Sequence, residues 1–170
     1  MDQRDTPHCV GFAWAAWLAA SPVRQRPIGG DGIYRLAQHF DEWQGVDYDG
    51  TSVRGGAKAL ALSGHITEYR WAFDVDSVVN HILRSGPVVL GTNWYRGMND
   101  AGDMQPTGSL LGGHAYLAYR ANVKTNQIGI RNSWGADFGT NGNGVMSLDT
   151  LERLLAENGE ACTALENKSC

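Results

Sequence analysis

A cysteine, a histidine and an asparagine stand at positions from which they could act together in nucleophilic catalysis. Cys9 opens a run without charge or proline that lies between Pro7 and Pro22, which predicts a buried helix with the cysteine in its first turn. The positive end of the helix dipole favours a thiolate there. A free cysteine is more often a small core residue, so Cys9 by itself does not indicate catalysis.

His114 follows two glycines where a turn becomes a predicted strand, and Asn132 ends the next predicted strand. If these strands pair as a hairpin, the two side chains can lie side by side at one rim of the sheet. A cysteine nucleophile needs a base within hydrogen-bond reach, and the base needs a third group that orients its ring. An asparagine carbonyl can accept the imidazole N–H, while Gln3 and the Cys9 amide could donate to an oxyanion.

The apolar pattern predicts mainly helices before residue 86. After the Cys9 helix, Asp31 would cap a second helix whose apolar face ends at Phe40, and a third is expected over 53–62. Asp74 would cap a fourth helix that stops before Pro87. Segment 45–52, rich in glycine and aspartate, is typical of a loop.

After Pro87 the period changes to that of strands. Strands are expected at 88–95, 115–121, 128–134, 145–148 and 161–165, with a helix over 148–155. The chain is therefore predicted to be α+β with two lobes. Residues 1–85 would form a mainly helical lobe with the nucleophile helix. Residues 86–170 would form a mainly β lobe with the histidine and asparagine, a C-terminal helix and a tail, both lobes together making one catalytic domain.

Composition narrows the function classes. The 170 residues carry a net charge of −4, which gives no footprint for nucleic acid or an anionic membrane. We find no 18-residue apolar run and no signal peptide. Three cysteines cannot form a disulfide framework, although Cys162 and Cys170 could pair. A cytoplasmic or virion-associated protein is the simplest interpretation.

The sequence predicts no metal site and no cofactor. Zinc sites usually contain local ligand pairs, and the cysteines and histidines here have no such spacing. Asp100 and Asp103 only faintly resemble a calcium loop and lack its 12-residue pattern.

Three motifs together resemble papain-like cysteine peptidases: Gln3 placed shortly before Cys9, Gly113-His114-Ala115, and Asn132-Ser133-Trp134-Gly135. The glycine-rich run 139–144 fits the loop that follows the asparagine motif in that family. The resemblance implies a helical left lobe and an antiparallel, β-barrel-like right lobe, with the active site in the cleft between them.

The resemblance also implies the role of each residue. Cys9 would be the nucleophile, His114 the general base and acid, and Asn132 the group that orients it. Gln3 would be the oxyanion donor, and Trp134 would shield the histidine–asparagine hydrogen bond from water.

The substrate implied by the resemblance is an extended polypeptide, paired as an added strand with a backbone segment at Gly50 and Thr51. Val53, Gly91 and Ala115 would line an apolar, rather open pocket for the side chain two residues upstream of the scissile bond. Trp134 is also expected among the substrate-binding residues.

The chain departs from the family in ways that suggest a short, disulfide-free, bacterial or viral-type member. The family signature C-G-[SA]-C-[WY] is replaced by Thr6-Pro7-His8-Cys9-Val10, so the neighbouring disulfide cysteine and the aromatic residue are missing. The separation from Cys9 to His114 is shorter than the roughly 130–150 residues of secreted members. Only two residues precede Gln3, so we expect either that the chain is processed or truncated, or that control comes from the timing of expression or from a protein partner or inhibitor that completes the N-terminal region.

The favoured interpretation is a cysteine peptidase that works through a Cys9 thioacyl intermediate. Two alternatives stay open. One is a binding or structural module on the same fold within a larger assembly. The other is a different acyl-transfer enzyme, such as an amidase, a peptidoglycan hydrolase or a transpeptidase.

Overall fold

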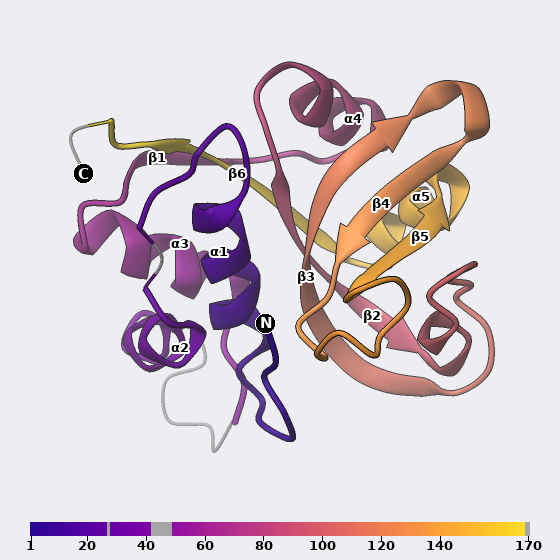
Figure 1. Cartoon of the computed structure of the whole chain (residues 1–170), viewed down its shortest axis with the longest axis horizontal. Helices are drawn as coiled ribbons and strands as arrows, with labels where there is room; N and C mark the ends of the chain where they lie inside the picture. The colour runs from indigo at the N-terminus through magenta and orange to yellow at the C-terminus, as the bar shows by residue number, and fades with distance from the viewer. Residues whose placement is uncertain (27, 42–48, 169–170) are drawn as a thin grey trace.

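The computed structural model describes residues 1–26, 28–41 and 49–168 (Figure 1). The helices are α1 (Cys9–Ala19), α2 (Gly30–Gln38), α3 (Val53–Leu62), α4 (Val75–Arg84) and α5 (Leu148–Ala156), with 3-10 turns at Arg96–Asn99 and Val123–Thr125. The strands are β1 (Ile66–Trp71), β2 (Val88–Tyr95), β3 (Leu110–Asn122), β4 (Gln127–Arg131), β5 (Asn143–Ser147) and β6 (Glu160–Glu166). Two expectations lie at least partly outside the described residues: the loop at 45–52, and the pairing of Cys162 with Cys170.

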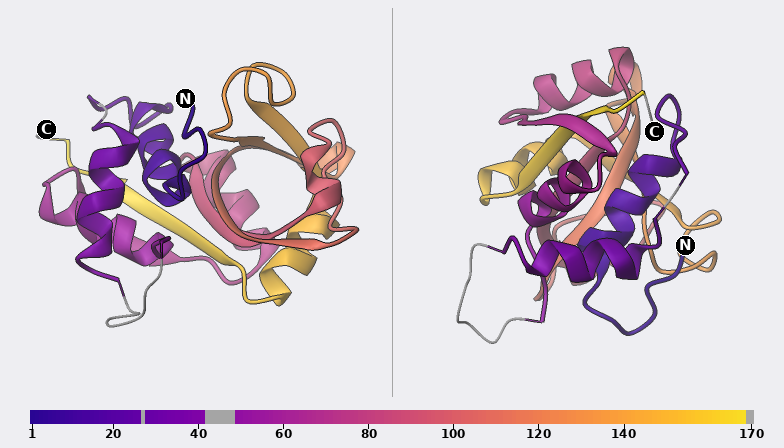
Figure 2. Two further views of the ribbon diagram at one scale, coloured as in Figure 1. Left: turned by 90° about the horizontal axis from the view of Figure 1, so that it is seen from below. Right: turned by 90° about the vertical axis from the view of Figure 1, so that its left-hand side faces the viewer.

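The strands form one antiparallel sheet in the order β1-β6-β2-β3-β4-β5. Strands β2 to β5 curl into an open ring with α5 packed at its edge, whereas β6 carries the end of the chain back toward α1 and α3, where β1 pairs with it (Figure 2). The mixed α and β composition confirms the expected α+β class. Sequence analysis assigned no element to β1, because its charged residues, Glu68 and Arg70, interrupt the apolar pattern.

Strands β2 and β3 form a wall shared by two hydrophobic cores. Successive side chains of a strand point to opposite faces. On β2, Val89 packs into the core around α1, whereas its neighbours Val88 and Leu90 pack into the core of the curled strands. On β3, Leu117 likewise packs into the core around α1, and its neighbour Tyr116 packs into the core of the curled strands. This two-sided burial explains why these strands have nearly continuous apolar runs rather than alternating ones.

Helix α1 is buried on nearly every side, as its lack of charge predicts. Two tryptophans join it to other segments as well as filling the core. The indole N–H of Trp14 donates to the Val53 carbonyl, and that of Trp17 donates to the Pro87 carbonyl, both at 3.1 Å. These bonds fix the nucleophile helix against the start of α3 and the start of β2.

Of the two helix caps that the sequence predicted, the one at α4 is confirmed and the one at α2 is wrong. Asp74 caps α4 by accepting the Ser77 N–H at 2.6 Å, as expected. The expectation that Asp31 caps α2 is wrong, because Gly29 holds the cap position and Asp31 lies in the first turn. The Asp31 carboxylate instead lies 2.7 Å from Nδ1 of His8, and near a helix N-terminus its charge is still favourable.

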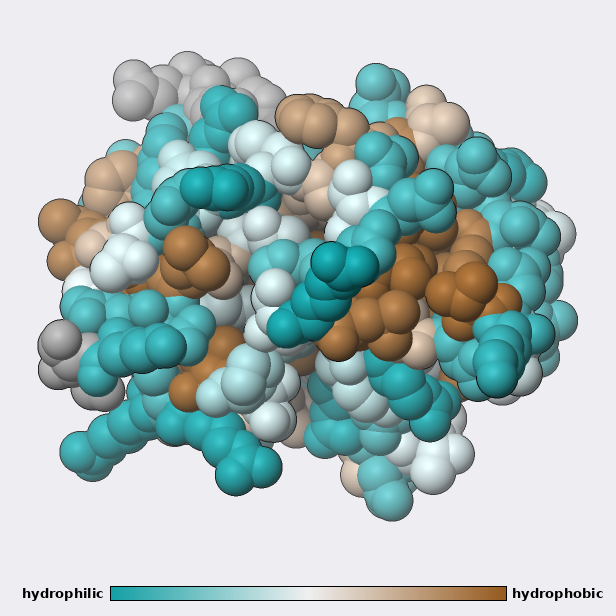
Figure 3. Space-filling view, turned by 90° about the horizontal axis from the view of Figure 1, so that it is seen from above, coloured by the Kyte–Doolittle hydropathy of each residue, from teal (hydrophilic) through white to brown (hydrophobic). Residues whose placement is uncertain are grey.

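Polar residues cover most of the face seen in Figure 3, and apolar residues gather on its right-hand side, the side of the curled strands. In the part of the chain that the structure describes, no helix is both long and apolar enough to cross a bilayer.

Candidate active site

Cys9 is the first residue of α1, and its side chain lines a cleft between the helices and β3. Burial raises the pKa of its thiol above the usual value, while the backbone N–H groups of Ala115, Val10 and Cys9 itself act in the opposite direction. The helix dipole, which sequence analysis expected to favour the thiolate, is therefore only one of several influences on the pKa of Cys9. In the free site, loss of water around the sulfur outweighs the backbone dipoles.

His114 on β3 and Asn132 just after β4 lie in direct contact. Imidazole Nε2 is 2.8 Å from Asn132 Oδ1, which also accepts the backbone N–H of Ser133 at 2.8 Å. Strands β3 and β4 pair antiparallel, as the hairpin hypothesis requires. Because Nε2 is held by the asparagine oxygen, it carries the proton in the neutral ring, and Nδ1 is the nitrogen left for Cys9.

Burial lowers the pKa of His114 to about 4, and the hydrogen bond to Asn132 acts weakly in the opposite direction. The cause is the aromatic side chains around the ring. Trp134 and Trp94 each lie 4.8 Å from it, measured between ring centroids. Trp134 thus packs on the imidazole, where the resemblance places a shield. Sequence analysis did not single out Trp94, and its place on β2, two residues from the position that pairs with His114, is the signal that could have found it.

Gln3 is tied to the segment that follows Asn132. Its backbone N–H donates to the Ser133 carbonyl at 2.7 Å, and its side-chain oxygen accepts the Ser133 hydroxyl. Its amide nitrogen donates one N–H to the Thr6 carbonyl at 2.7 Å and lines the same cleft as Cys9. A second N–H on that nitrogen is available to an oxyanion.

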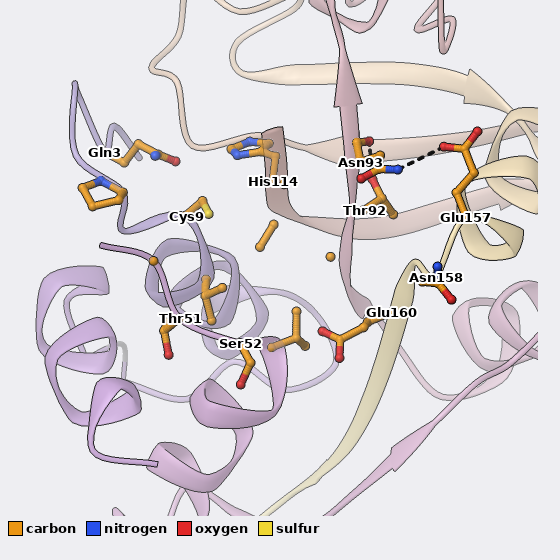
Figure 4. Close-up of a pocket in the computed structure, with 17 residues that line it drawn as sticks. Gln3, Cys9, Thr51, Ser52, Thr92, Asn93, His114, Glu157, Asn158 and Glu160 are labelled. Atoms are coloured by element: carbon orange, nitrogen blue, oxygen red, sulfur yellow. Dashed lines mark hydrogen bonds between the residues drawn. The ribbon is translucent and has the colours of Figure 1, made fainter. Parts of the chain in front are cut away.

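The cleft has a volume of about 500 Å³ (Figure 4). Cys9 lies at the end of its helix, across from His114 on the strand, with Gln3 beside both of them. Five of the six positions expected to bind substrate line it: Gly50, Thr51, Val53, Gly91 and Ala115. Trp134, the sixth, packs on the His114 ring instead. The absence of a side chain at Gly91 keeps this space open, since a Cβ there would come within 2.7 Å of Val53 Cγ2.

The far end of the cleft is acidic, which sequence analysis did not anticipate. Glu157 and Asn158, on the connection from α5 to β6, and Glu160, the first residue of β6, line it. Glu160 Oε2 lies 3.6 Å from the place a Cβ of Gly91 would take, so a carboxylate borders the pocket that sequence analysis expected to be apolar. Glu157 accepts hydrogen bonds from Tyr95 and Asn93, at 2.8 and 3.2 Å, and these help to lower the pKa of its carboxyl.

Within the described ranges, no group of three or more histidine, cysteine, aspartate or glutamate side chains is placed to hold a metal ion.

The fold is that of papain-like cysteine proteases, so the expected resemblance is confirmed for the fold. Among similar solved structures is xylellain, a cysteine protease from Xylella fastidiosa. It has a TM-score of 0.77 and 20% sequence identity, over 99% of this chain and 82% of that one. The bromelain protease from Ananas comosus, solved with the E64 inhibitor, has a TM-score of 0.69 and 14% identity, over 98% and 92% of the two chains.

A digestive procathepsin L 3 of Tenebrio molitor is also similar, with a TM-score of 0.71 and 14% identity, over 96% of this chain and 65% of that one. No family model matches the sequence. No curated protein matches it either. The likeness is thus carried by structure much more than by sequence.

Proposed function

We propose that the protein is a cysteine peptidase that hydrolyses peptide bonds through a thioacyl intermediate on Cys9. The observation that carries the proposal is the hydrogen bond from His114 Nε2 to Asn132 Oδ1, which leaves Nδ1 for a thiol at the start of a buried helix. The similar solved structures, which are those of cysteine proteases, support the same reaction class.

In the acylation half, the thiol proton of Cys9 passes to Nδ1 of His114, and the thiolate attacks the peptide carbonyl carbon. The tetrahedral oxyanion accepts hydrogen bonds from the Gln3 side chain and the Cys9 backbone N–H. When the intermediate collapses, the C–N bond breaks and His114 gives its proton to the leaving amine. A thioester on Cys9 remains.

In the deacylation half, His114 removes a proton from a water molecule that attacks the thioester carbonyl. The second tetrahedral intermediate expels the sulfur, which recovers the proton from His114 as the carboxylic acid product leaves. Asn132 keeps the ring in one orientation during both proton transfers.

The proton transfer between Cys9 and His114 is governed by the pair as a whole. Burial favours the neutral form of each group taken alone, as the raised pKa of Cys9 and the lowered pKa of His114 indicate. Two opposite unit charges about 4 Å apart attract each other by about 4 kcal/mol at an effective dielectric constant of 20. This attraction, together with the Asn132 hydrogen bond, offsets the loss of solvation when both groups become charged.

The substrate is proposed to be an extended polypeptide that lies along Gly50 and Thr51 by adding a strand to that segment. The side chain two residues upstream of the cleaved bond would enter between Val53, Gly91 and Ala115. A protein partner or inhibitor at the N-terminal region stays a prediction. In the structure, Met1 to Gln3 already pair with the segment around Trp134, through an antiparallel bridge from Asp2 and the hydrogen bond from Gly135 N to the Met1 carbonyl.

The test is intact-mass analysis after brief treatment with a substoichiometric peptidyl epoxide at about pH 6 and pH 8. We expect one adduct, mapped to Cys9, that is lost in His114→Ala. The matched control is Cys162, which is also free but buried, with a pKa raised to about 12, and should not react. If Cys9 reacts no faster than free cysteine and no peptide is cleaved, the proposal fails in favour of a binding module. If only non-peptide acyl groups turn over, it fails in favour of another acyl-transfer enzyme.

A further inference from the structure

A chain of side-chain contacts joins the nucleophile to the wall of the cleft on which the peptide is proposed to lie. His8, directly before Cys9, stacks its ring on that of Tyr34, with 3.8 Å between centroids and 25° between planes. The Tyr34 hydroxyl donates to the backbone carbonyl of Asp49. Asp49 is followed by Gly50 and Thr51, which line the cleft.

Each side chain in this chain of contacts is itself held in place. The carboxylate of Asp31 lies 2.7 Å from Nδ1 of His8, and the Gln38 amide donates to the Tyr34 hydroxyl at 2.8 Å. Tyr34 is buried on α2, which packs tightly on α1: a Cβ on Gly11 would come within 2.8 Å of the Tyr34 backbone nitrogen. The ring therefore has little freedom to move relative to Cys9.

The other bonds from α1 to this wall lie further along the chain. Trp14 reaches the Val53 carbonyl, at the start of α3, and the Ser52 hydroxyl caps that helix through the Gly55 N–H at 2.9 Å. The Tyr34 hydroxyl acts on the opposite side of Gly50 and Thr51, at Asp49. Among the described residues, Cys9 and Cys162 are both free, so no disulfide performs this task there.

We propose that Tyr34 and His8 are positioning residues that set the distance between Cys9 and the peptide-binding backbone at Gly50 and Thr51. This inference rests on the proposed peptidase function and adds how its two binding elements are kept in register. Tyr34 acts on the wall of the cleft through the Asp49 carbonyl. His8 acts on the nucleophile because it is the N-cap residue of α1, directly before Cys9. Its side chain makes no hydrogen bond to that helix and is held instead by Tyr34 and Asp31.

The first variant is Tyr34→Phe, which keeps the ring and its stacking on His8 and removes the hydroxyl. We expect KM for an extended peptide substrate to rise about tenfold, as loss of one hydrogen bond allows, with kcat within about twofold. The rate at which chloroacetamide alkylates Cys9 should not change, since that small reagent does not need the wall. An unchanged KM, or an equal loss in kcat and in alkylation, would overturn the role assigned to Tyr34.

The second pair of variants is His8→Ala and His8→Phe. We expect His8→Ala to lower kcat and the Cys9 alkylation rate about tenfold, and His8→Phe, which can stack on Tyr34, to recover most of both. His39→Ala, at an exposed histidine just beyond the end of α2, is the matched control and should change neither rate. A His8→Phe variant as slow as His8→Ala would contradict positioning by the stacked ring.

A readout without substrate separates this inference from the proposed function. Amide hydrogen exchange of a peptide that covers residues 49–53 should be several-fold faster in Tyr34→Phe than in the unmodified chain, with exchange in β4 unchanged. If the chain cleaves no peptide at all, the peptidase proposal fails while this measurement still decides the positioning role. Unchanged exchange at 49–53 would overturn the inference even in an active peptidase.

Discussion

Asn132 Oδ1 is shared between the imidazole Nε2 of His114 and the backbone N–H of Ser133, with 2.8 Å to each. The second bond fixes the asparagine side chain to its own turn, so the oxygen stays where the histidine needs it. Both residues are almost fully buried, at 7% and 2% exposure, which protects the bond from competing water.

This relationship predicts an order of severity among three substitutions. Cys9→Ala removes the nucleophile and His114→Ala the base, so each should lower kcat by more than about 10⁴-fold. Asn132→Ala leaves a base that is only misoriented and should cost about 10²-fold. The comparison needs kcat for all three variants on one peptide substrate. An Asn132→Ala variant slower than His114→Ala would reverse the roles assigned to these residues.

The lowered pKa of His114 predicts a pH dependence of stability. Its pKa falls from about 6.5 in the unfolded chain to about 4 in the fold, so between these values the unfolded state binds more protons. In a Cys9→Ala background, where no thiolate can pair with the imidazolium, the contribution is fully present above pH 6.5. It is lost as the pH falls toward 4, and amounts to about 3 kcal/mol.

The measurement is urea unfolding of Cys9→Ala and of Cys9→Ala/His114→Gln at several pH values from 4 to 7. Carboxyl groups titrate equally in the two variants, so only the difference between them reports on His114. As the pH falls from 7 to 4, the free energy of unfolding should decrease more steeply in Cys9→Ala, which keeps His114, than in Cys9→Ala/His114→Gln. If the free energies of unfolding of the two variants change in parallel with pH, burial does not lower the pKa of His114.

The carboxylate of Glu160 predicts a preference for a basic side chain two residues upstream of the cleaved bond. Glu160 lines the cleft beside Gly91, while Arg54 and Glu160 both act electrostatically on the buried thiol of Cys162, so a cation of the fold also lies near this carboxylate. A partly solvated ion pair with the substrate is therefore worth at most about 1 kcal/mol, or about fivefold in kcat/KM.

Glu160→Gln should lower kcat/KM for peptides with arginine at that position about fivefold and leave peptides with leucine there unchanged. Glu152→Gln, at an exposed position on α5, changes the net charge equally and should alter neither. Equal losses for both peptides in Glu160→Gln would mean that the carboxylate does not face the substrate.

The close approach of Gly91 and Val53 predicts a coupled pair of substitutions. Gly91→Ala would place a methyl group 2.7 Å from Val53 Cγ2 and should destabilise the fold by about 1–3 kcal/mol. Val53→Ala removes the clashing methyl group, so the double variant should be more stable than the sum of the single effects implies. Thermal unfolding of the four proteins gives the coupling, and additive effects would argue against the clash.

The sequence predicted the elements that have strong local signals. The run from Cys9 and the cap at Asp74 each gave a helix close to its observed bounds, and residues 88–95 gave β2 to the residue. The order of the cysteine, histidine and asparagine motifs predicted which side chains meet, because antiparallel pairing of neighbouring strands brings their ends together. Sequence analysis missed strand β1 because its charged residues interrupt the apolar pattern. Its strand partner among the described residues, β6, lies almost a hundred residues away, so no neighbouring segment indicates the pairing.

Sequence analysis also missed the acidic end of the cleft, for a related reason. Glu157 lies on the connection between α5 and β6 and Glu160 is the first residue of β6, and glutamate is common at such positions in any sequence. Nothing local indicates that β6 inserts between β1 and β2 and so carries these carboxylates to the substrate pocket. The sequence does not indicate the positioning role proposed for His8 either, since its partners Asp31 and Tyr34 become its neighbours only when α2 packs on α1.

The position of β6 between β1 and β2 has a consequence for the timing of folding. The strand that supplies the histidine, β3, rests on β2, and β2 is bordered on its other side by residues 160–162. A ribosome therefore has to release nearly the whole polypeptide before the sheet can close. Cys9 comes long before β6 in the chain, yet no nascent chain that ends before β6 can hold a finished cleft, because Glu160 of that strand lines it.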